Sequence, residues 1–265
     1  QKHGVTPGLA AVLVGDDPAS AIYVRNKRRA CDEVGMVSDT TLLPADATTE
    51  QVLATVDSLN KDSRFHGILV QLPLPSQVNE LAVIESINPD KDVDGLHPFN
   101  LGLLGIGKPR FISCTPWGVM MLLKHSGITM EGKHAVVLGR SNLVGRPLSI
   151  LLSEKNANCT VTVCHSRTRN LAGMTSQADI LVAAIGRPEY VTADMVKPGA
   201  VVIDVGINRI VDADGKKHTV GDVDFEAVKS VASHISPVPG GVGPMTITML
   251  MKNTLKSLKF RLGVQ

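Results

Sequence analysis

The sequence lacks any run of about 18 consecutive apolar residues, although 43% of its 265 residues are hydrophobic. A helix that spans a bilayer needs roughly 20 such residues, so no membrane-spanning helix is expected. A basic face is missing as well, because the net charge is only +2 and the lysines and arginines are spread along the chain. The composition therefore argues against a membrane protein and against a nucleic-acid binder.

Cysteine is scarce. The four cysteines are Cys31, Cys114, Cys159 and Cys164, and no two of them form a C-x-x-C pair. This usage suits reduced thiols in a cytosolic or organelle-matrix protein, and it offers neither a disulfide framework nor a zinc site. No metal is therefore expected.

An initiating methionine is absent, because the chain opens at Gln1 and enters an apolar strand within a few residues. We expect a native N-terminal segment to precede it, and any targeting peptide would lie there. The expected compartment is the cytoplasm, with the mitochondrial matrix as the alternative if a transit peptide has been removed.

Short β-branched runs alternate with helical periods along the chain. Strands are predicted at 9–15, 67–74, 135–139, 160–164, 179–186 and 200–207. Amphipathic stretches, such as 20–35 and 48–60, lie between most of them and predict helices. Continuous apolar strands separated by helices indicate parallel sheets covered on both faces, which is the α/β class.

A loop-rich segment divides the chain into two α/β units. Residues 89–116 contain several glycines and prolines and show little periodicity, and a new helix is predicted after Thr115. The last helix, 244–260, follows the turn-rich stretch P-V-P-G-G-V-G-P, and Pro244 suits its first position. We place the domain boundary at the loop-rich segment.

Two motif look-alikes lack a residue that their chemistry requires. The stretch 102–109 satisfies G-x-x-x-x-G-K, but Pro109 stands where a P-loop needs a magnesium-binding Ser or Thr. The stretch that begins D-K-D-V-D-G at Asp90 opens like an EF-hand loop, but its twelfth position is Leu101 instead of a bidentate Glu. Neither a P-loop nor a calcium site is expected.

The stretch A-V-V-L-G-R-S-N-L-V-G-R-P-L-S, 135–149, is a stronger candidate. A strand ends at Gly139, Gly145 and Pro147 open a helix, and the next strand follows after about one helix length. A dinucleotide-binding βαβ unit has this order, with the diphosphate over the helix N-terminus. Arg140 and Ser141, however, stand where the usual G-x-G-x-x-G pattern places glycine.

The residues after the second strand of this unit indicate which cofactor it binds. NAD-specific units usually carry an Asp or Glu there for the ribose 2′-hydroxyl, whereas this chain reads C-H-S-R-T-R-N and offers Ser166 and Arg167. This favours the 2′-phosphate of NADP, which Arg140 can grip in a bidentate way. The alternative is that Arg140 and Ser141 only cap a helix of an ordinary α/β domain.

One helix in the first half carries a lysine on its less polar face. Ser20, Tyr23 and Lys27 fall on one face of 20–35, and the stripe continues through Cys31 and Val34. A lysine on the less polar face can have its pKa lowered by desolvation, as a proton-transfer residue needs. The alternative is a surface lysine that snorkels from a basic helix. Gln71, at a strand end before a proline-rich turn, is a second polar candidate.

Together, six ordered motifs make the chain resemble the bifunctional methylenetetrahydrofolate dehydrogenase/cyclohydrolase family over nearly its whole length. They are S-x-x-Y-V-x-x-K (20–27), G-I-L-V-Q-L-P-L-P (67–75), P-D-K-D-V-D-G (89–95), C-T-P-x-G (114–118), G-R-S-x-x-V-G-x-P (139–147) and P-V-P-G-G-V-G-P-M-T (237–246).

The resemblance implies two α/β domains flanking a cleft, the second of them a Rossmann-like dinucleotide-binding domain. We expect residues 1–116 and 245–265 to form the catalytic, folate-binding domain and residues 117–244 the NADP-binding domain. The implied reactions are the NADP-dependent oxidation of 5,10-methylenetetrahydrofolate to the methenyl form and its hydrolysis to 10-formyltetrahydrofolate. The resemblance also implies a homodimer.

The implied site residues follow from the matching motif positions. Lys27 resembles the family's general acid/base, and Gln71 resembles the neighbour that helps to set the protonation state of that lysine. Tyr23 would pack on the folate rings, and Asp94 would accept hydrogen bonds from the pterin. The full implied substrate set is Tyr23, Val70, Gln71, Leu72, Asp94, Pro239, Gly240 and Gly243. The implied NADP contacts are Gly139, Arg140, Ser141, Ser166 and Ile207.

Two other functions stay open at this point. An NAD-preferring monofunctional dehydrogenase of the same fold would be expected to lose the lysine chemistry or to carry an acid after the second strand. A ligand-binding paralogue would hold folate without turnover. Lys27 and the sequence H-S-R-T speak against the dehydrogenase alternative, and Lys27 and Gln71 speak against the paralogue.

Overall fold

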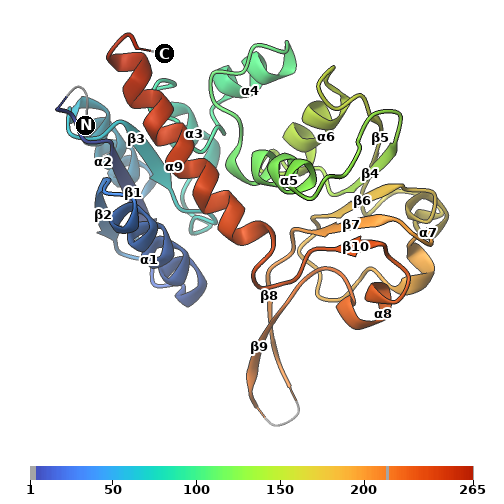
Figure 1. Ribbon diagram of the computed structural model, residues 1–265. Helices are drawn as coiled ribbons and strands as arrows, with labels where there is room; N and C mark the ends of the chain where they lie inside the picture. The colour runs from blue at the N-terminus through green and yellow to red at the C-terminus, as the bar shows by residue number, and fades with distance from the viewer. Residues whose placement is uncertain (1–3, 213–214, 265) are drawn as a thin grey trace. The chain divides into compact units, whose positions relative to one another are not determined.

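The computed structural model describes residues 4–212 and 215–264. The chain divides into two compact units, which we describe separately: unit 1 comprises Gln1–Cys114 and Ile247–Gln265, and unit 2 comprises Thr115–Thr246 (Figure 1). The two-part α/β architecture predicted from the sequence is confirmed. The functional domain limits at 116/117 and 244/245 stay a prediction.

Unit 1 is built on a three-stranded parallel sheet in the order β2-β1-β3. Its strands are β1 (Gly8–Val14), β2 (Val37–Leu43) and β3 (Gly67–Val70). Its helices are α1 (Pro18–Glu33), α2 (Thr49–Lys61), α3 (Glu80–Ser86), α4 (Pro98–Gly105) and, from Ile247 onward, α9 (Val242–Arg261). Each parallel connection runs through a helix, as the βαβ pattern requires.

Helices cover both faces of this sheet. On one face, Val12 and Ile68 pack with Val52 of α2 and Val83 of α3. On the other face, α1 and α9 meet, and the Sγ of Cys31 lies 3.4 Å from the Sδ of Met251. Figure 1 shows α9 running along this layer. The last helix of the chain is therefore part of the core around the first strands.

Unit 2 contains a five-stranded parallel sheet in the order β10-β7-β6-β4-β5. Its strands are β4 (His134–Leu138), β5 (Thr160–Cys164), β6 (Ile180–Ala183), β7 (Val201–Asp204) and β10 (His234–Ile235). The helical elements are α5 (Cys114–His125), α6 (Gly145–Ser153), α7 (Leu171–Thr175), the 3-10 turn η1 (Ala193–Met195) and α8 (Phe225–Lys229). The chain passes from β4 to β5 on one side and then to β6 on the other, so the strand order reverses at β4.

Alternate residues of these strands build two cores. Val137 and Val182 pack with Val119 of α5 and Leu148 of α6. Their sequence neighbours point to the opposite face, where Val136 and Leu181 join a cluster that includes α7 and α8. The uninterrupted apolar runs seen in the sequence are explained by burial on both faces.

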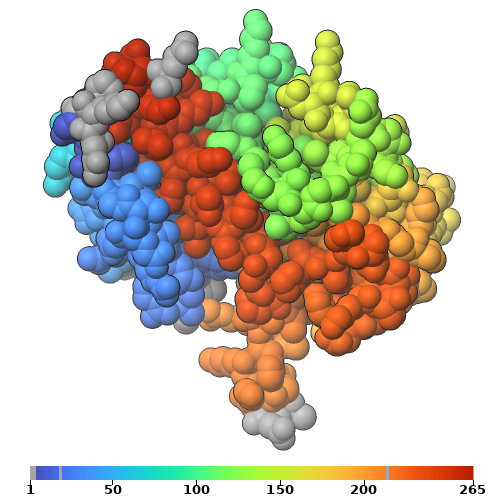
Figure 2. All heavy atoms as spheres, in the orientation of Figure 1, coloured from blue at the N-terminus to red at the C-terminus, as the bar shows by residue number. Residues whose placement is uncertain are grey.

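A two-stranded antiparallel hairpin, β8 (Asn208–Val211) with β9 (Lys217–Val220), follows the sheet of unit 2. It extends away from the five strands in Figures 1 and 2. Among the described residues, no helix is long and apolar enough to cross a membrane.

The six predicted strands are present, and several of them end earlier than predicted. The strand predicted at 67–74 is β3, which stops at Val70 because Pro73 cannot donate to a ladder. Strand β7 ends at Asp204 instead of 207. The expected continuation of the stripe of Ser20, Tyr23 and Lys27 to Val34 is wrong, since Val34 follows the helix as its C-cap and is 59% exposed.

Candidate functional site

Lys27 and Gln71 are brought together in unit 1 although 44 residues separate them in sequence. The Nζ of Lys27 donates a hydrogen bond of 3.0 Å to Oε1 of Gln71. The Nε2 of Gln71 in turn donates to the carbonyl of Leu72 at 2.7 Å, which fixes the amide with its oxygen toward the lysine. Helix α1 supplies the amine, and the residue just after β3 supplies its acceptor.

The amine of Lys27 is tuned by its surroundings. Burial lowers the pKa of Lys27 below its usual range, and the nearby charge of Asp94 opposes this effect. Desolvation penalises the ammonium form, and Gln71 is a neutral acceptor that does not stabilise it as a carboxylate would. A lysine with a lowered pKa gives up its proton more readily than an exposed lysine does.

The two aspartates of the D-V-D-G stretch have different surroundings. Asp92 is buried and accepts hydrogen bonds from the N–H groups of Leu96 (3.1 Å) and His97 (2.9 Å) and from Nδ2 of Asn100 (2.8 Å). Asp94 is half-buried and lies near Lys27 and the buried thiol of Cys114. Asp92 therefore orders the loop, whereas Asp94 takes no part in these bonds.

The other substrate candidates of unit 1 lie on the same two elements. Tyr23 is half-buried on α1, one turn before Lys27. Val70 is buried at the end of β3, and Leu72, half-buried, follows Gln71. The structure thus gathers Tyr23, Lys27, Val70, Gln71, Leu72 and Asp94 in unit 1.

The glycine turn of unit 2 has the close packing of a dinucleotide-binding loop. Gly139 has a φ of +129°, and a Cβ there would collide with the carbonyl of Ala184, after β6. A Cβ on Gly145 would collide with the carbonyl of Gly139. Both glycines are needed so that β4 can turn tightly into α6, at the carboxyl ends of β4 and β6, where the strand order reverses.

Ser141 braces this turn, because its Oγ accepts the N–H of Val144 at 3.1 Å. Arg140 is exposed. Because Leu138 and Cys164 are partners in the β4·β5 ladder, Arg140 and Ser166 follow adjacent strand ends. No carboxylate stands directly after β5, so these residues fit a 2′-phosphate better than a 2′-hydroxyl.

The remaining candidates also belong to unit 2. Ile207 is 45% exposed after β7, and its Cδ1 lies 3.9 Å from a Cβ built on Gly243. Pro239 and Gly240 are exposed, and Gly240 has a φ of +105°. The structure therefore groups Pro239, Gly240 and Gly243 with the cofactor candidates of unit 2, while the lysine site belongs to unit 1.

Several residues that support these sites are not among the sequence candidates. Asn253 of α9 donates to the carbonyls of Val93 (2.8 Å) and Ile112 (2.9 Å), which lie shortly before Asp94 and Cys114 in the sequence. Its only sequence signal is a polar residue on the apolar face of α9, which a sequence pattern does not connect with a loop about 160 residues earlier. Among the described residues, no group of three His, Cys, Asp or Glu side chains could hold a metal ion.

A parallel sheet with a glycine turn at its switch point, together with a unit that carries a tuned lysine, defines a two-unit α/β protein of the dinucleotide-binding class. The catalytic-domain profile of the tetrahydrofolate dehydrogenase/cyclohydrolases matches residues 1–94, and their NAD(P)-binding-domain profile matches residues 113–262. The chain belongs to the tetrahydrofolate dehydrogenase/cyclohydrolase family.

Individual relatives are similar to this chain over almost its full length. The bifunctional protein FolD of Geotalea daltonii is 56% identical, with 98% of this chain and 90% of the relative covered. The crystal structure of bifunctional FolD from Campylobacter jejuni is 50% identical with a TM-score of 0.92, covering 98% of this chain and 90% of that one. FolD from Trypanosoma brucei, solved with NADP and an inhibitor, is 41% identical with a TM-score of 0.93, covering 98% and 89%.

Proposed function

We propose that residues of unit 1 bind the folate and move the protons of both reactions, and that residues of unit 2 bind NADP. The chain is a bifunctional enzyme. It oxidises 5,10-methylenetetrahydrofolate to 5,10-methenyltetrahydrofolate with NADP+ and hydrolyses the product to 10-formyltetrahydrofolate. The match of both domains of the family supports this assignment.

The observation that carries the catalytic proposal is the bond between Lys27 and Gln71. A neutral amine that donates one N–H to Gln71 keeps its lone pair for the proton of an attacking water. The methenyl intermediate is a cation, so a permanently charged lysine next to it would be repelled. A lowered pKa of Lys27 therefore favours both the formation and the hydrolysis of the cation.

Asp94 is proposed to hold the folate by its pterin edge, which presents N–H donors to a group that only accepts. Tyr23 is proposed to pack on the folate rings, and Val70 and Leu72 to flank them. Pro239, Gly240 and Gly243 are proposed as further substrate contacts, where glycine lets backbone approach a ligand closely.

NADP+ supplies the hydride acceptor of the first reaction. In unit 2, Gly139 gives the turn its shape and Ser141 braces it. Arg140 and Ser166 are proposed to bind the 2′-phosphate, and Ile207 to contact the cofactor. The absence of a carboxylate directly after β5 supports NADP over NAD.

We also propose that the chain forms a homodimer and that it works in the cytoplasm. The family resemblance supports a homodimer, which light scattering on the purified chain would test. All four cysteines are buried and free, as in a reducing compartment, which supports the cytoplasm.

One assay tests the function as a whole. Protein is mixed with methylenetetrahydrofolate and either NADP+ or NAD+, and reduced cofactor and methenyl absorbance are followed together. We expect turnover with NADP+, a transient methenyl signal, and weaker turnover with NAD+. Preference for NAD+ without hydrolysis would indicate the monofunctional alternative, and binding without turnover would indicate the paralogue.

A further inference from the structure

Two buried carboxylates connect three loop segments of unit 2. Asp204 ends β7 and is 3% exposed, and Asp222 follows β9 and is 0% exposed. The segments that they join are 184–187 after β6, 205–208 after β7 and 221–223. All lie within unit 2, and the first two follow the carboxyl ends of neighbouring sheet strands.

Asp222 organises the first segment. Its carboxylate accepts the backbone N–H groups of Ile185 (2.6 Å), Gly186 (2.9 Å) and Arg187 (2.9 Å). Successive N–H groups that converge in this way form a nest that normally attracts an anion. Here the anion is a side chain of the protein, so the turn has a fixed shape before any ligand arrives.

Asp204 organises the second and third segments. It accepts the N–H groups of Gly206, Asp222 and Val223, each at 2.9 Å. Asn208 completes the connection, because its Nδ2 donates to Asp222 at 2.9 Å. The carboxylates are thus bound on all sides by donors.

Two glycines make room for this pair. A Cβ on Gly206 would overlap the carboxylate of Asp222, and a Cβ on Gly221 would overlap that of Asp204. Burying two carboxylates is costly, and well-packed apolar side chains commonly provide equal or better stability. The arrangement is better explained by the geometry that it imposes on the backbone.

The geometry is imposed on residues next to the cofactor candidates. Ile207 lies between Gly206, which Asp204 holds, and Asn208, which is bonded to Asp222. Ala184, whose carbonyl packs on Gly139, directly precedes Ile185, which Asp222 holds. Displacing either carboxylate would therefore move the backbone on both of these contacts.

We propose that Asp204 and Asp222 are a positioning pair that sets segments 184–187 and 205–208 for NADP binding. They act through the backbone of Ile185–Arg187 and Gly206–Asn208 and do not touch the cofactor themselves. The inference rests on the proposed cofactor roles of Gly139 and Ile207.

The test is Asp222→Asn in the full chain. The amide replaces one acceptor oxygen by a donor that faces backbone N–H groups, so the segments must separate. We expect the Kd and KM for NADP+ to rise at least tenfold. Hydrolysis of methenyltetrahydrofolate, which needs no cofactor, should stay near the parent rate and reports a folded chain.

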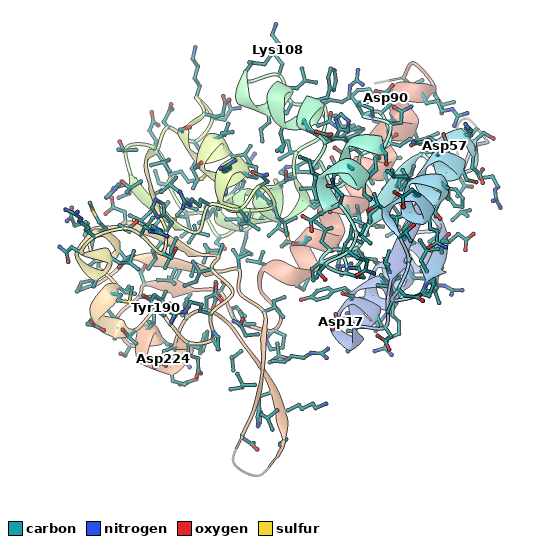
Figure 3. All side chains as sticks on the ribbon, turned by 180° about the vertical axis from the view of Figure 1, so that it is seen from behind. Asp17, Asp57, Asp90, Lys108, Tyr190 and Asp224 are labelled. Carbon is teal, nitrogen blue, oxygen red and sulfur yellow. The ribbon has the colours of Figure 1, made fainter. Side chains whose placement is uncertain are left out.

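Asp224→Asn is the matched control, two residues further on. Asp224 caps α8 by accepting the N–H of Ala227 at 3.1 Å, and Asn caps equally well, so NADP+ affinity should not change (Figure 3). If Asp222→Asn does not fold, Asn208→Ala removes one donor to the pair and should raise the Kd severalfold.

The outcomes separate the two levels of the proposal. Unchanged NADP+ affinity in folded Asp222→Asn overturns the positioning role. The same result in Asn208→Ala overturns it where Asp222→Asn does not fold. The proposed function stands in either case if Arg140→Ala still weakens NADP+ binding. A parent chain that binds no NADP+ at all would instead overturn the proposed function.

Discussion

Removing the amine of Lys27 should affect the two reactions to different extents. Hydride transfer depends mainly on positioning, whereas opening the methenyl ring needs proton transfer to and from water and the ring nitrogen. Lys27→Met keeps much of the apolar stem and removes the titratable group. We expect cyclohydrolase activity to fall by roughly a hundredfold or more, with a smaller or comparable loss of dehydrogenase activity, both measured by methenyl absorbance.

Arg28→Met is the control, because Arg28 is exposed on the same helix. It should leave both rates near the parent values. If folded Lys27→Met hydrolyses methenyltetrahydrofolate at the parent rate, the bond between Lys27 and Gln71 has only a structural role and another residue handles the proton.

Asp94 offers a second residue-level prediction. Asp94→Asn places a donor opposite the donor-rich edge of the pterin, so folate affinity should fall while NADP+ affinity stays the same, both by equilibrium titration. Asp90→Asn changes the same loop at its exposed ion pair with Arg110 and should have little effect (Figure 3). Equal folate affinity in Asp94→Asn and the parent would remove Asp94 from the substrate contacts.

Arg140 decides between the two cofactors. If it binds the 2′-phosphate, Arg140→Ala should weaken NADP+ by about 2 kcal/mol and barely change NAD+. Calorimetric titration with both cofactors measures this directly. Equal losses for the two cofactors would mean that Arg140 only supports the turn.

At the residue scale, the sequence proposes candidate positions for chemistry but does not show how their side chains are bonded. The spacing D-V-D-G presents two carboxylates, and nothing in it says which one turns inward. That choice is made by Asn100 and the N–H groups of Leu96 and His97, which bind Asp92 and not Asp94. Such long-range satisfaction of buried groups has no short sequence signature.

The turn between β4 and α6 is the element that depends most on glycine. Gly145→Ala would press a methyl group onto the carbonyl of Gly139, and overpacking of this kind typically costs about 1–3 kcal/mol. We expect lower stability of unit 2 and at least tenfold weaker NADP+ binding. Ser149→Ala, one turn along α6, should change neither, and an unaffected Gly145→Ala would show that the turn has spare room.

Some strands could not be predicted from the sequence pattern. The buried strands β1, β4 and β6 are apolar runs and were predicted. Strand β2 was not, because an edge strand of sequence V-S-D-T-T-L-L has polar residues on its exposed side and weak alternation. The hairpin β8–β9 was missed for a similar reason, since alternate residues are exposed on both strands.

The stability of the whole chain depends on pH, and the contribution of one group, Asp204, can be measured. Burial raises the pKa of Asp204 to about 6, and the charge of Asp222 adds to this effect. Between about pH 4 and pH 6, the folded chain keeps a proton that the unfolded chain has lost. Stability from this group is therefore complete below pH 4 and decreases as the pH rises to 6, by about 3 kcal/mol.

Trp117, the single tryptophan, lies in α5 of unit 2 and gives a fluorescence signal for urea unfolding. The free energy of unfolding of the parent minus that of Asp204→Asn should decrease as the pH rises from 4 to 6. A difference that is constant over this range would contradict the raised pKa of Asp204.

The discontinuity of unit 1 has a consequence for biosynthesis. Unit 2 is one continuous segment whose translation ends at residue 246, whereas unit 1 also requires residues 247–265. Until α9 emerges, the carbonyls of Val93 and Ile112 lack the amide of Asn253, and Thr254 is absent from beside Gly67. Because domains fold as units once their segments are available, unit 1 depends on two segments that are translated far apart, whereas unit 2 depends on one. The core of the unit that carries Lys27 is therefore completed only by a helix that is translated after all of unit 2.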